Sequence, residues 1–239
     1  MKIKNIDTIF FDFGGTLDSD GVHSRTLFFN ALTDRLNLHK WKNKFQDAYS
    51  YADSVINKEG LVAKLDLKAM NYQFVLLIVC KLNQMGFLSK VINKINQKDI
   101  DCMANKITNI QAYYLRRNKN ILSLLKQKKY RLGIISNFSG NLEIILHQFE
   151  LQKYFKVVID SYYLGVQKPD LKIFKEGLAA FNSTNSMFVG DNIERDIMPA
   201  KRLKMHTVLV SSSMSSSMPF GLDNDMYVIN HLYQLKHLL

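Results

Sequence analysis

At 239 residues, the chain is long enough for one large domain or for a domain that carries a sizeable insertion. Hydrophobic residues make up 47% of it and charged residues 22%, as expected of a soluble globular protein. The formal net charge of +11 favours anionic partners, of which phosphorylated metabolites and nucleic acids are the obvious classes.

The distribution of the basic residues argues against nucleic acid. They are spread along the chain and do not form one basic tract with interleaved aromatic residues. The densest cluster, residues 126–129, precedes a predicted strand and is interpreted as the solvated end of a helix. We therefore expect a small anionic ligand and no nucleic acid.

Cysteine usage and hydropathy predict a cytoplasmic protein. Cys80 and Cys102 have no metal-ligand spacing, so two free thiols in a reducing compartment are expected. The first residues lack the apolar core and cleavage site of a signal peptide. The longest apolar run, residues 74–80, is too short to span a bilayer, so no membrane association is expected. The oligomeric state stays open.

The first predicted element is a strand over residues 6–11, which leads directly into a carboxylate. An uninterrupted Ile/Phe run stopped by turn residues is typical of a buried parallel strand. Asp12 follows it at the rim of the predicted sheet, where open α/β folds bind their ligands. Gly14 and Gly15 then allow a sharp turn and a close approach of backbone to ligand.

Residues 18–116 show helical spacing and no convincing strand. This predicts a small helical bundle inserted after the first strand, with the aromatic and methionine side chains in its core. The stripes are Leu27, Phe28, Ala31, Leu32 and Leu36; Trp41, Phe45, Ala48, Tyr49 and Ala52; Met70, Phe74, Leu77, Ile78 and Leu82; a weaker set of Val91, Ile92 and Ile95; and a last helix over 100–115.

From about residue 118 the pattern alternates between strands and helices. Such alternation predicts an α/β fold with a doubly wound parallel sheet, formed by residues 1–17 and 117–239. The expected strands are 130–137, 157–160, 186–191, 207–210 and 227–229, and the expected helices are 121–125, 141–149, 171–181, 197–203 and one at the C-terminus. Residues 211–217 are serine-rich and are interpreted as a loop.

Two later strands also end in polar residues. Ser136 and Asn137 end one strand, Asp191 ends another, and Lys168 lies in a turn before a helix. The carboxyl ends of parallel strands share one edge of a sheet, so these groups are expected to converge with Asp12. Singly, each has an ordinary structural explanation; Asp191 and Asp196, for instance, could cap the following helix.

Together these residues fit phosphoryl transfer. Two carboxylates can hold Mg²⁺, which takes its other ligands from water and substrate phosphate, and Asp196 could orient the water shell. Lys168 can neutralise phosphate and the attacking carboxylate, and the Ser136 hydroxyl can hold phosphoryl oxygens. Asp12 can then act as a covalent nucleophile that forms an aspartyl-phosphate.

The segments 12–18, 136–137, 168–169 and 190–196 resemble the four motifs of the haloacid dehalogenase superfamily. The resemblance implies a Rossmann-like core, Asp12 as nucleophile, and a substrate phosphate bound among the residues Gly15, Thr16, Ser136, Asn137 and Lys168. It also implies Mg²⁺ held by Asp12, the Gly14 backbone carbonyl and Asp191, with Asp196 behind them. The insertion at 18–116 then corresponds to an all-helical cap domain, and the 32 positions from Ser136 to Lys168 leave no room for a second cap.

One position departs from the family pattern. Phosphatases of this superfamily usually carry a second Asp two positions after the nucleophile, where this chain has Gly14. That carboxylate protonates the leaving oxygen and then activates water, a contribution of about 10²–10⁴-fold. Asp20 and His23 are candidate replacements, each with a structural or solvated alternative, and Asp18 is expected to cap a helix N-terminus.

The sequence therefore predicts a Mg²⁺-dependent hydrolase that acts on a small phosphorylated metabolite. One alternative is a catalytically degenerate relative that binds a phosphorylated ligand. Another is a phosphonatase-like or dehalogenase-like hydrolase, although metal-free dehalogenases lack the paired acids seen around Asp191. The identity of the substrate depends on side chains of the cap, whose orientation no sequence pattern predicts.

Overall fold

The structure is a computed structural model that describes residues 3, 5–87, 95–212 and 226–239. Its centre is a six-stranded sheet in the order β3-β2-β1-β4-β5-β6, with every neighbouring pair parallel. The strands are β1 (Thr8–Phe11), β2 (Arg131–Ser136), β3 (Val157–Asp160), β4 (Ser186–Gly190), β5 (His206–Val210) and β6 (Met226–Ile229). The predicted doubly wound α/β fold is confirmed.

The strand order places a topological switch point beside β1. The chain runs outward from β1 through β2 to β3, then returns to the other side of β1 for β4. Phe11, the last residue of β1, lies opposite Ile134 of β2 and Val189 of β4. The crevice beyond the carboxyl ends of β2, β1 and β4 is therefore the place where a ligand can enter between diverging connections.

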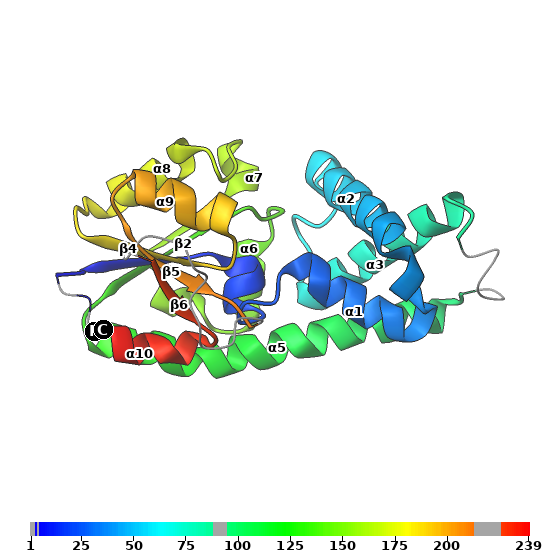
Figure 1. Cartoon of the computed structure of the whole chain (residues 1–239), viewed down its shortest axis with the longest axis horizontal. Helices are drawn as coiled ribbons and strands as arrows, with labels where there is room; N and C mark the ends of the chain where they lie inside the picture. The colour runs from blue at the N-terminus through cyan, green and yellow to red at the C-terminus, as the bar shows by residue number, and fades with distance from the viewer. Residues whose placement is uncertain (1–2, 4, 88–94, 213–225) are drawn as a thin grey trace.

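Helices cover both faces of the sheet, as Figure 1 shows. Side chains alternate along β1, so Ile9 and Phe11 pack into one cluster and Phe10 into another. The first cluster includes residues of α5 (Gln97–Gln127), α6 (Leu142–Gln148) and α10 (Leu235–Leu238). The second includes residues of α8 (Leu171–Phe181) and α9 (Met198–Arg202).

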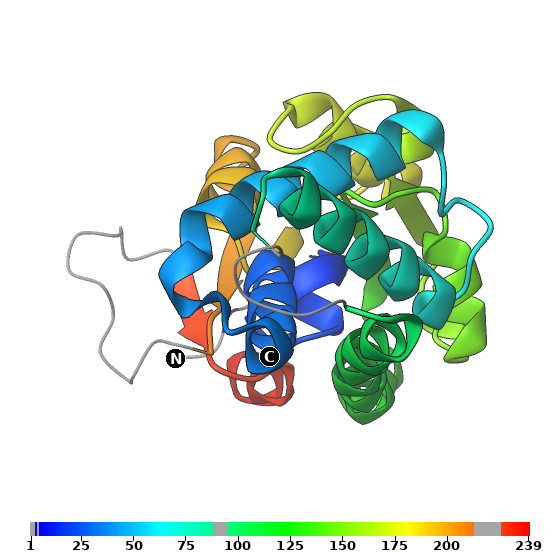
Figure 2. The ribbon, with the colours of Figure 1, turned by 90° about the vertical axis from the view of Figure 1, so that its right-hand side faces the viewer.

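Three helices lie beyond one end of the sheet (Figures 1 and 2), and residues from each of them line a cavity at the crevice. They are α1 (Ser24–Leu36), α2 (Lys42–Glu59) and α3 (Leu67–Gln84). Nearly all of the stripe residues predicted for them are buried, so the predicted bundle is confirmed for this part. Val91 and Ile92 of the weaker stripe lie outside the described residues.

Short elements complete the fold. They are helix α7 (Ser161–Leu164), turns of 3₁₀ helix at Leu38–Trp41, Gln152–Tyr154 and Leu232–Gln234, and tight helical turns at Phe13–Leu17 and Ile193–Ile197. The last two turns follow β1 and β4 directly, so they lie at the carboxyl edge of the sheet.

Helix α5 differs from the prediction. The sequence predicted two helices, over 100–115 and 121–125, but the structure has one helix of 31 residues, about 46 Å long at 1.5 Å per residue. The polar stretch at 116–120 separates the two predicted helices, yet Arg and Lys are good helix formers and the helix runs through it. Asn118 is buried there and donates to the carbonyl of Leu17, which ties the middle of the helix to the turn that follows β1.

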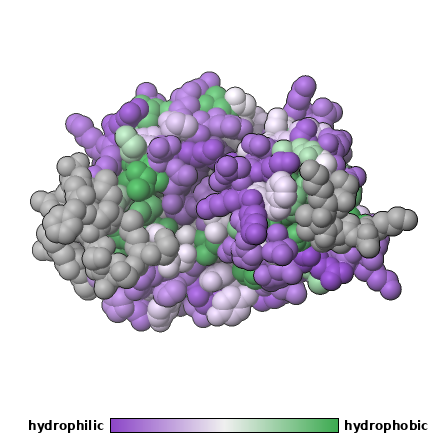
Figure 3. Space-filling view, turned by 45° about the vertical axis from the view of Figure 1, so that its right-hand side comes forward, coloured by the Kyte–Doolittle hydropathy of each residue, from purple (hydrophilic) through white to green (hydrophobic). Residues whose placement is uncertain are grey.

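Among the described residues, few large hydrophobic side chains are exposed. On the face shown in Figure 3, hydrophilic residues predominate and hydrophobic ones form only small groups. In the described chain, no helix has both the length and the apolar character required to cross a bilayer. Cys80 and Cys102 are exposed free thiols, as predicted.

Candidate active site

Asp12 lies just past the end of β1 with its carboxylate held by three donors. Its backbone N–H donates to the Val189 carbonyl at 2.9 Å, which continues the pairing with β4. Its Oδ1 accepts from the Phe13 N–H and the Ser136 hydroxyl, both at 2.7 Å, and lies 2.8 Å from Lys168 Nζ. The side chain is therefore fixed in one orientation within a nearly closed site.

Lys168 is buried between two carboxylates. Its Nζ lies 2.7 Å from Asp196 Oδ1 as well as 2.8 Å from Asp12 Oδ1. Burial alone would lower the pKa of this ammonium, but the charges of Asp12 and Asp196 outweigh it, and the pKa is raised above its ordinary value. Lys168 is therefore a permanent cation at the site.

The side chain of Asn137 holds the backbone of Lys168. Its Nδ2 donates to the Lys168 carbonyl at 2.9 Å, and its Oδ1 accepts from the Lys168 N–H at 2.7 Å. The amide therefore positions the lysine, and its polar atoms face that peptide instead of the carboxylates. The sequence placed Asn137 beside a substrate phosphate but contained no signal for this clamp.

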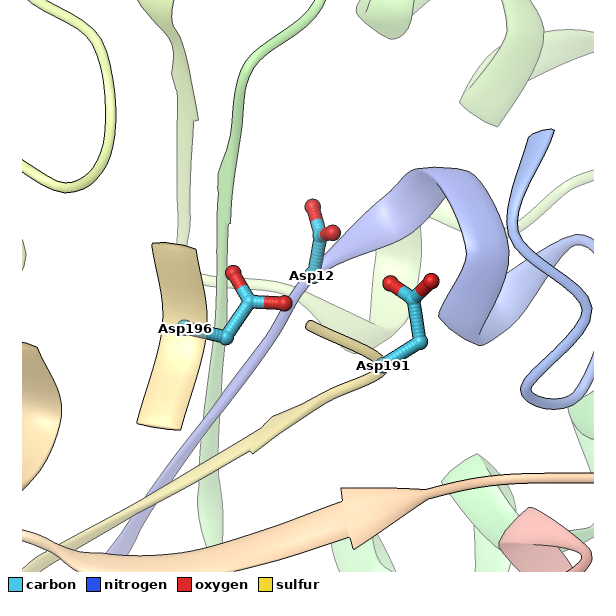
Figure 4. Close-up of side chains that lie close together, drawn as sticks. All are labelled: Asp12, Asp191 and Asp196. Carbon is cyan, nitrogen blue, oxygen red and sulfur yellow. The ribbon is translucent and has the colours of Figure 1, made fainter. Parts of the chain in front are cut away.

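Three carboxylates converge at the switch point. One oxygen from each of Asp12, Asp191 and Asp196 lies within 4.8 Å of the others, and Figure 4 shows the three groups turned toward a common space. Burial, followed by the charges of Asp12 and Asp196, holds the pKa of Asp191 well above its ordinary value. Burial likewise raises the pKa of Asp196 to about 6. Such a cluster is unfavourable when it contains no cation other than Lys168.

The turn after β1 passes very close to Asp191. Gly15 has a φ of +87°, and a Cβ added there would overlap the Asp191 carboxylate. The Thr16 hydroxyl lies 3.5 Å from Asp191 Oδ1, whereas Asp191 Oδ2 is buried with no hydrogen-bond partner in the described chain. An unpartnered buried carboxylate oxygen is costly unless a ligand completes its contacts.

The carboxylate cluster opens into a cavity of about 320 Å³ between the sheet edge and the helices beyond it. Its walls include further residues for which the sequence held no functional signal; all but Arg195, in the turn after β4, come from helices whose approach depends on tertiary packing. They are Arg25, Phe28, Tyr49, Asp53, Gln111 and Arg195.

Asp20 is not part of this cavity wall, so its candidacy as a replacement acid is wrong. The carboxylate is buried and forms an ion pair with Arg117. It also accepts from the Asn118 side chain at 3.2 Å and lies 3.4 Å from His231 Nδ1. Through these contacts Asp20 joins the segment after β1 to α5 and to the C-terminal segment.

His23 lines the cavity and caps α1. Its Nδ1 accepts from the Arg25 N–H at 3.2 Å, so the neutral ring carries its proton on Nε2. Burial, with the charges of Arg195 and Arg25, lowers the pKa of this imidazole. His23 therefore faces the cavity as a neutral group that can donate one hydrogen bond.

Asp18 does not cap a helix N-terminus, contrary to the prediction; His23 caps α1 instead. The Oδ1 atom of Asp18 accepts from the Gly15 N–H at 2.8 Å and the Ser19 hydroxyl at 2.7 Å. Its Oδ2 atom accepts from Gln111 Nε2 at 2.7 Å. It lines the cavity although only 1% of it is exposed, and burial raises its pKa to about 6.

This raised pKa predicts a pH-dependent stability difference between the wild type and Asp18→Asn. Well below pH 4 the carboxyl is protonated in both folded and unfolded chains, whereas near pH 7 it is ionised in both and only the folded chain buries the charge. Stability of the wild type relative to Asp18→Asn should therefore fall as pH rises from 4 to 7, by on the order of 3 kcal/mol. Urea unfolding in EDTA measures it.

Asp101→Asn, at an exposed position, is the control for the effect of an Asp-to-Asn change on overall stability. The amide at position 18 also changes hydrogen bonding, but this adds the same amount to the stability difference at every pH. A stability difference between the wild type and Asp18→Asn that does not change with pH would show that burial does not shift the pKa of this carboxyl.

The sequence profile of the haloacid dehalogenase-like hydrolase family matches residues 6–204, which include all four predicted motifs. The chain belongs to this family of hydrolases. The predicted resemblance is thus confirmed over most of the chain.

Curated relatives of this hydrolase include phosphatases. Glyceraldehyde 3-phosphate phosphatase of Pyrococcus furiosus is 29% identical over 247 residues, an alignment that covers 99% of this chain and 94% of the relative. The same-named protein of Pyrococcus abyssi is 40% identical over 109 residues, covering 42% of this chain and 44% of the relative. Rhythmically expressed gene 2 protein of Drosophila melanogaster is 35% identical over 91 residues, 36% of this chain and 35% of that protein. The chain thus spans less than half the length of the last two relatives.

Solved structures share the fold over the whole length of this hydrolase. The HAD phosphatase from Thermococcus onnurineus has a TM-score of 0.53 at 19% identity, covering 97% of both chains. A putative HAD-hydrolase from Bacillus subtilis bound to magnesium has a TM-score of 0.58 at 20% identity, covering 99% of both chains. At this level of identity the likeness establishes the fold alone.

Proposed function

We propose that this hydrolase is a Mg²⁺-dependent phosphatase of a small phosphorylated metabolite and works through an aspartyl-phosphate on Asp12. The observation that carries the proposal is the convergence of Asp12, Asp191 and Asp196 within 4.8 Å around the buried cation of Lys168. The phosphatases among the relatives support a small phosphorylated substrate.

The carboxylates fit a hard divalent cation. Asp12 and Asp191 would hold Mg²⁺ with the Gly14 carbonyl, and the unpartnered Oδ2 of Asp191 supports this assignment. Asp196 already accepts from Lys168 and the Asn192 N–H, so it would act behind the metal ligands. When bound, Mg²⁺ would neutralise negative charge on the transferring phosphoryl group.

Asp12 is built to act as the nucleophile. Its Oδ1 accepts from three donors, of which Ser136 and Lys168 would turn to the substrate phosphate and leave Oδ1 to the metal, and no donor from the described residues is recorded for Oδ2. Oδ2 would attack phosphorus while the bond from phosphorus to the leaving oxygen breaks. Lys168 and Ser136 lie beside the attacking carboxylate. They can transfer their hydrogen bonds to the phosphoryl oxygens as negative charge develops on those oxygens.

The remaining steps need a proton donor and a base that position 14 does not provide. The leaving oxygen must gain a proton, and water must then lose one as it cleaves the aspartyl-phosphate and releases inorganic phosphate. Asp18 and His23 are titratable groups of the cavity wall that could serve, whereas Asp20 is occupied elsewhere.

We further propose that residues 18–116 act as a cap over a core formed by residues 1–17 and 117–239. The helices beyond the sheet contribute Phe28 and Tyr49 to the cavity that Asp12 and Lys168 line from the core. The boundary at 116 falls inside α5, so this helix would join cap and core.

The direct test is release of inorganic phosphate from a panel of phosphorylated metabolites. We expect Mg²⁺-dependent turnover of at least one compound, abolished by EDTA and reduced at least about 10³-fold in Asp12→Asn, since the amide is no nucleophile. The same change at an exposed site, Asp101→Asn, is the matched control and should keep full activity.

The proposed phosphatase function would be refuted if no compound of the panel were turned over although a phosphorylated ligand bound measurably. Halide release from a 2-haloacid that survives EDTA would instead support a dehalogenase.

Gly14 favours a second candidate function, a degenerate protein that binds a phosphorylated ligand with little turnover. Its backbone has a φ of −73° and a ψ of 124°, which any residue adopts, so no backbone constraint requires glycine there. A Cβ at this position would lie 3.3 Å from the Ser24 hydroxyl, a contact that a small side-chain shift relieves.

Gly14→Asp distinguishes the two functions. In a degenerate site, the restored carboxylate should raise phosphatase activity by about 10²–10⁴-fold, the usual contribution of a positioned acid and base. In a working enzyme, activity should fall, because the new charge crowds the Ser24 hydroxyl and the metal ligands.

A further inference from the structure

Arg25 occupies the second position of α1 and lines the cavity together with Asp12, Lys168 and Asp191. It comes from the helices beyond the sheet, whereas the other three groups come from the sheet edge. The cavity thus has a cationic side chain on a wall separate from the groups already assigned to the phosphate.

The guanidinium of Arg25 is held in place by its neighbours. It lies over the Tyr49 ring at 5.2 Å from the ring centroid, and its terminal nitrogen donates to the Ser50 hydroxyl at 3.3 Å. Tyr49 is itself fixed by aromatic contacts with Phe28 at 5.7 Å and Phe74 at 6.0 Å. A ligand that binds this guanidinium therefore needs to immobilise little of the side chain.

Arg25 nevertheless has no counter-ion in the described chain. Its Nε is buried without a hydrogen-bond partner, and no described carboxylate lies within 4.0 Å of it. Three other arginines of the described chain have such partners, whereas none is recorded for Arg195 of the same cavity: Arg35 pairs with Asp99, Arg117 with Asp20, and Arg131 with Asp7.

Asp53 is an acidic residue of the same cavity wall that could be expected to pair with Arg25. Burial raises its pKa, although the charges of Arg195 and Arg25 act in the opposite direction. It is not within ion-pair distance of Arg25, so the buried Nε–H still has no acceptor.

We propose that Arg25 binds a second anionic group of the substrate, so that the preferred substrate is a phosphomonoester that also carries a carboxylate or another phosphate. This inference rests on the phosphatase function proposed above. The guanidinium fork matches both kinds of anion, and a cavity of about 320 Å³ accommodates a small metabolite with charged groups at both ends.

The test compares substrates that differ at one carbon. Glycerol 3-phosphate, glyceraldehyde 3-phosphate and 3-phosphoglycerate carry an alcohol, an aldehyde and a carboxylate at the same position. We expect kcat/KM to be about 10–100-fold higher for the carboxylate than for either neutral compound, the range of one charge-assisted contact. Fructose 6-phosphate and fructose 1,6-bisphosphate form the parallel pair for a second phosphate and show which anion is preferred.

Arg25→Met should remove this preference. The ratio of kcat/KM between 3-phosphoglycerate and glycerol 3-phosphate, or between the two fructose phosphates, should fall toward one, mainly through KM of the doubly anionic compound. Arg25→Lys should retain part of the ratio, because it keeps the charge but loses the fork. Arg35→Met removes a guanidinium from the same helix outside the cavity and should leave the ratio unchanged.

An equal loss of activity on all compounds in Arg25→Met would overturn the proposal, since Arg25 would then bind the transferred phosphate. Wild-type ratios near one for both substrate pairs would overturn it as well. Binding to Asp12→Asn, measured by calorimetry, separates this inference from the proposed function. A tighter Kd for a doubly anionic compound that disappears in Asp12→Asn/Arg25→Met supports the Arg25 site even without turnover, and equal Kd values refute it.

Discussion

Replacing Gly15 by alanine is expected to abolish the Mg²⁺ response and to lower phosphate release at least about 10²-fold, the effect of a displacement of about 1 Å at a catalytic site. The added Cβ would overlap the Asp191 carboxylate, and the φ of +87° is strained for alanine. The measurements are the rise in melting temperature on addition of Mg²⁺ and the rate of phosphate release.

Gly14→Ala is the matched control, one residue away in the same turn. Its φ of −73° suits alanine, and its Cβ would meet only the Ser24 hydroxyl at 3.3 Å. It should keep the Mg²⁺ response and gain up to about 1 kcal/mol of stability from the restricted unfolded chain. If both variants responded to Mg²⁺ like the wild type, Asp191 would not be a ligand.

Lys168→Met is expected to reduce the free energy of unfolding by about 3–5 kcal/mol in EDTA, because it removes the cation from two buried carboxylates. Asp12, Asp191 and Asp196 would then repel one another without compensation. Mg²⁺ should restore part of the lost stability, since it supplies positive charge to the same cluster. Urea unfolding with EDTA and with Mg²⁺ measures both effects.

The same variant should also lose phosphatase activity, by about 10²–10³-fold, as expected when one preorganised donor of an active site is removed. Lys175→Met, on an exposed position of α8, is the control and should match the wild type in stability and activity. Wild-type stability of Lys168→Met in EDTA would mean that the cluster does not depend on this cation.

The positions of the chemical groups at the sheet edge could be predicted because each is local to a strand end. Asp12, Ser136 and Asp191 follow or end short buried apolar runs, and parallel pairing brings the ends of such runs to one edge. The structure places these groups and Lys168 together as the sequence predicted.

Interactions between segments far apart in the sequence were not predictable. Asp20 and His23 are three residues apart, yet Asp20 turns to Arg117 on α5 and His23 to the cavity. Asp18 was expected to cap a helix, but Gln111, 93 positions later, fixes its carboxylate. For Asp18 and Asp20 the partner is brought close by packing of α5, which runs unbroken through the polar stretch at 116–120.

The sequence by itself determined the sheet and the chemistry at its edge, since hydrophobic periodicity and the residue types at strand ends are local properties. Only the tertiary structure decided which polar side chains line the cavity. Arg25, Tyr49 and Asp53 come from helices whose relative placement depends on side-chain packing across the bundle. A stripe of apolar residues reports which face of a helix is buried, but not which polar side chain at its margin faces the substrate.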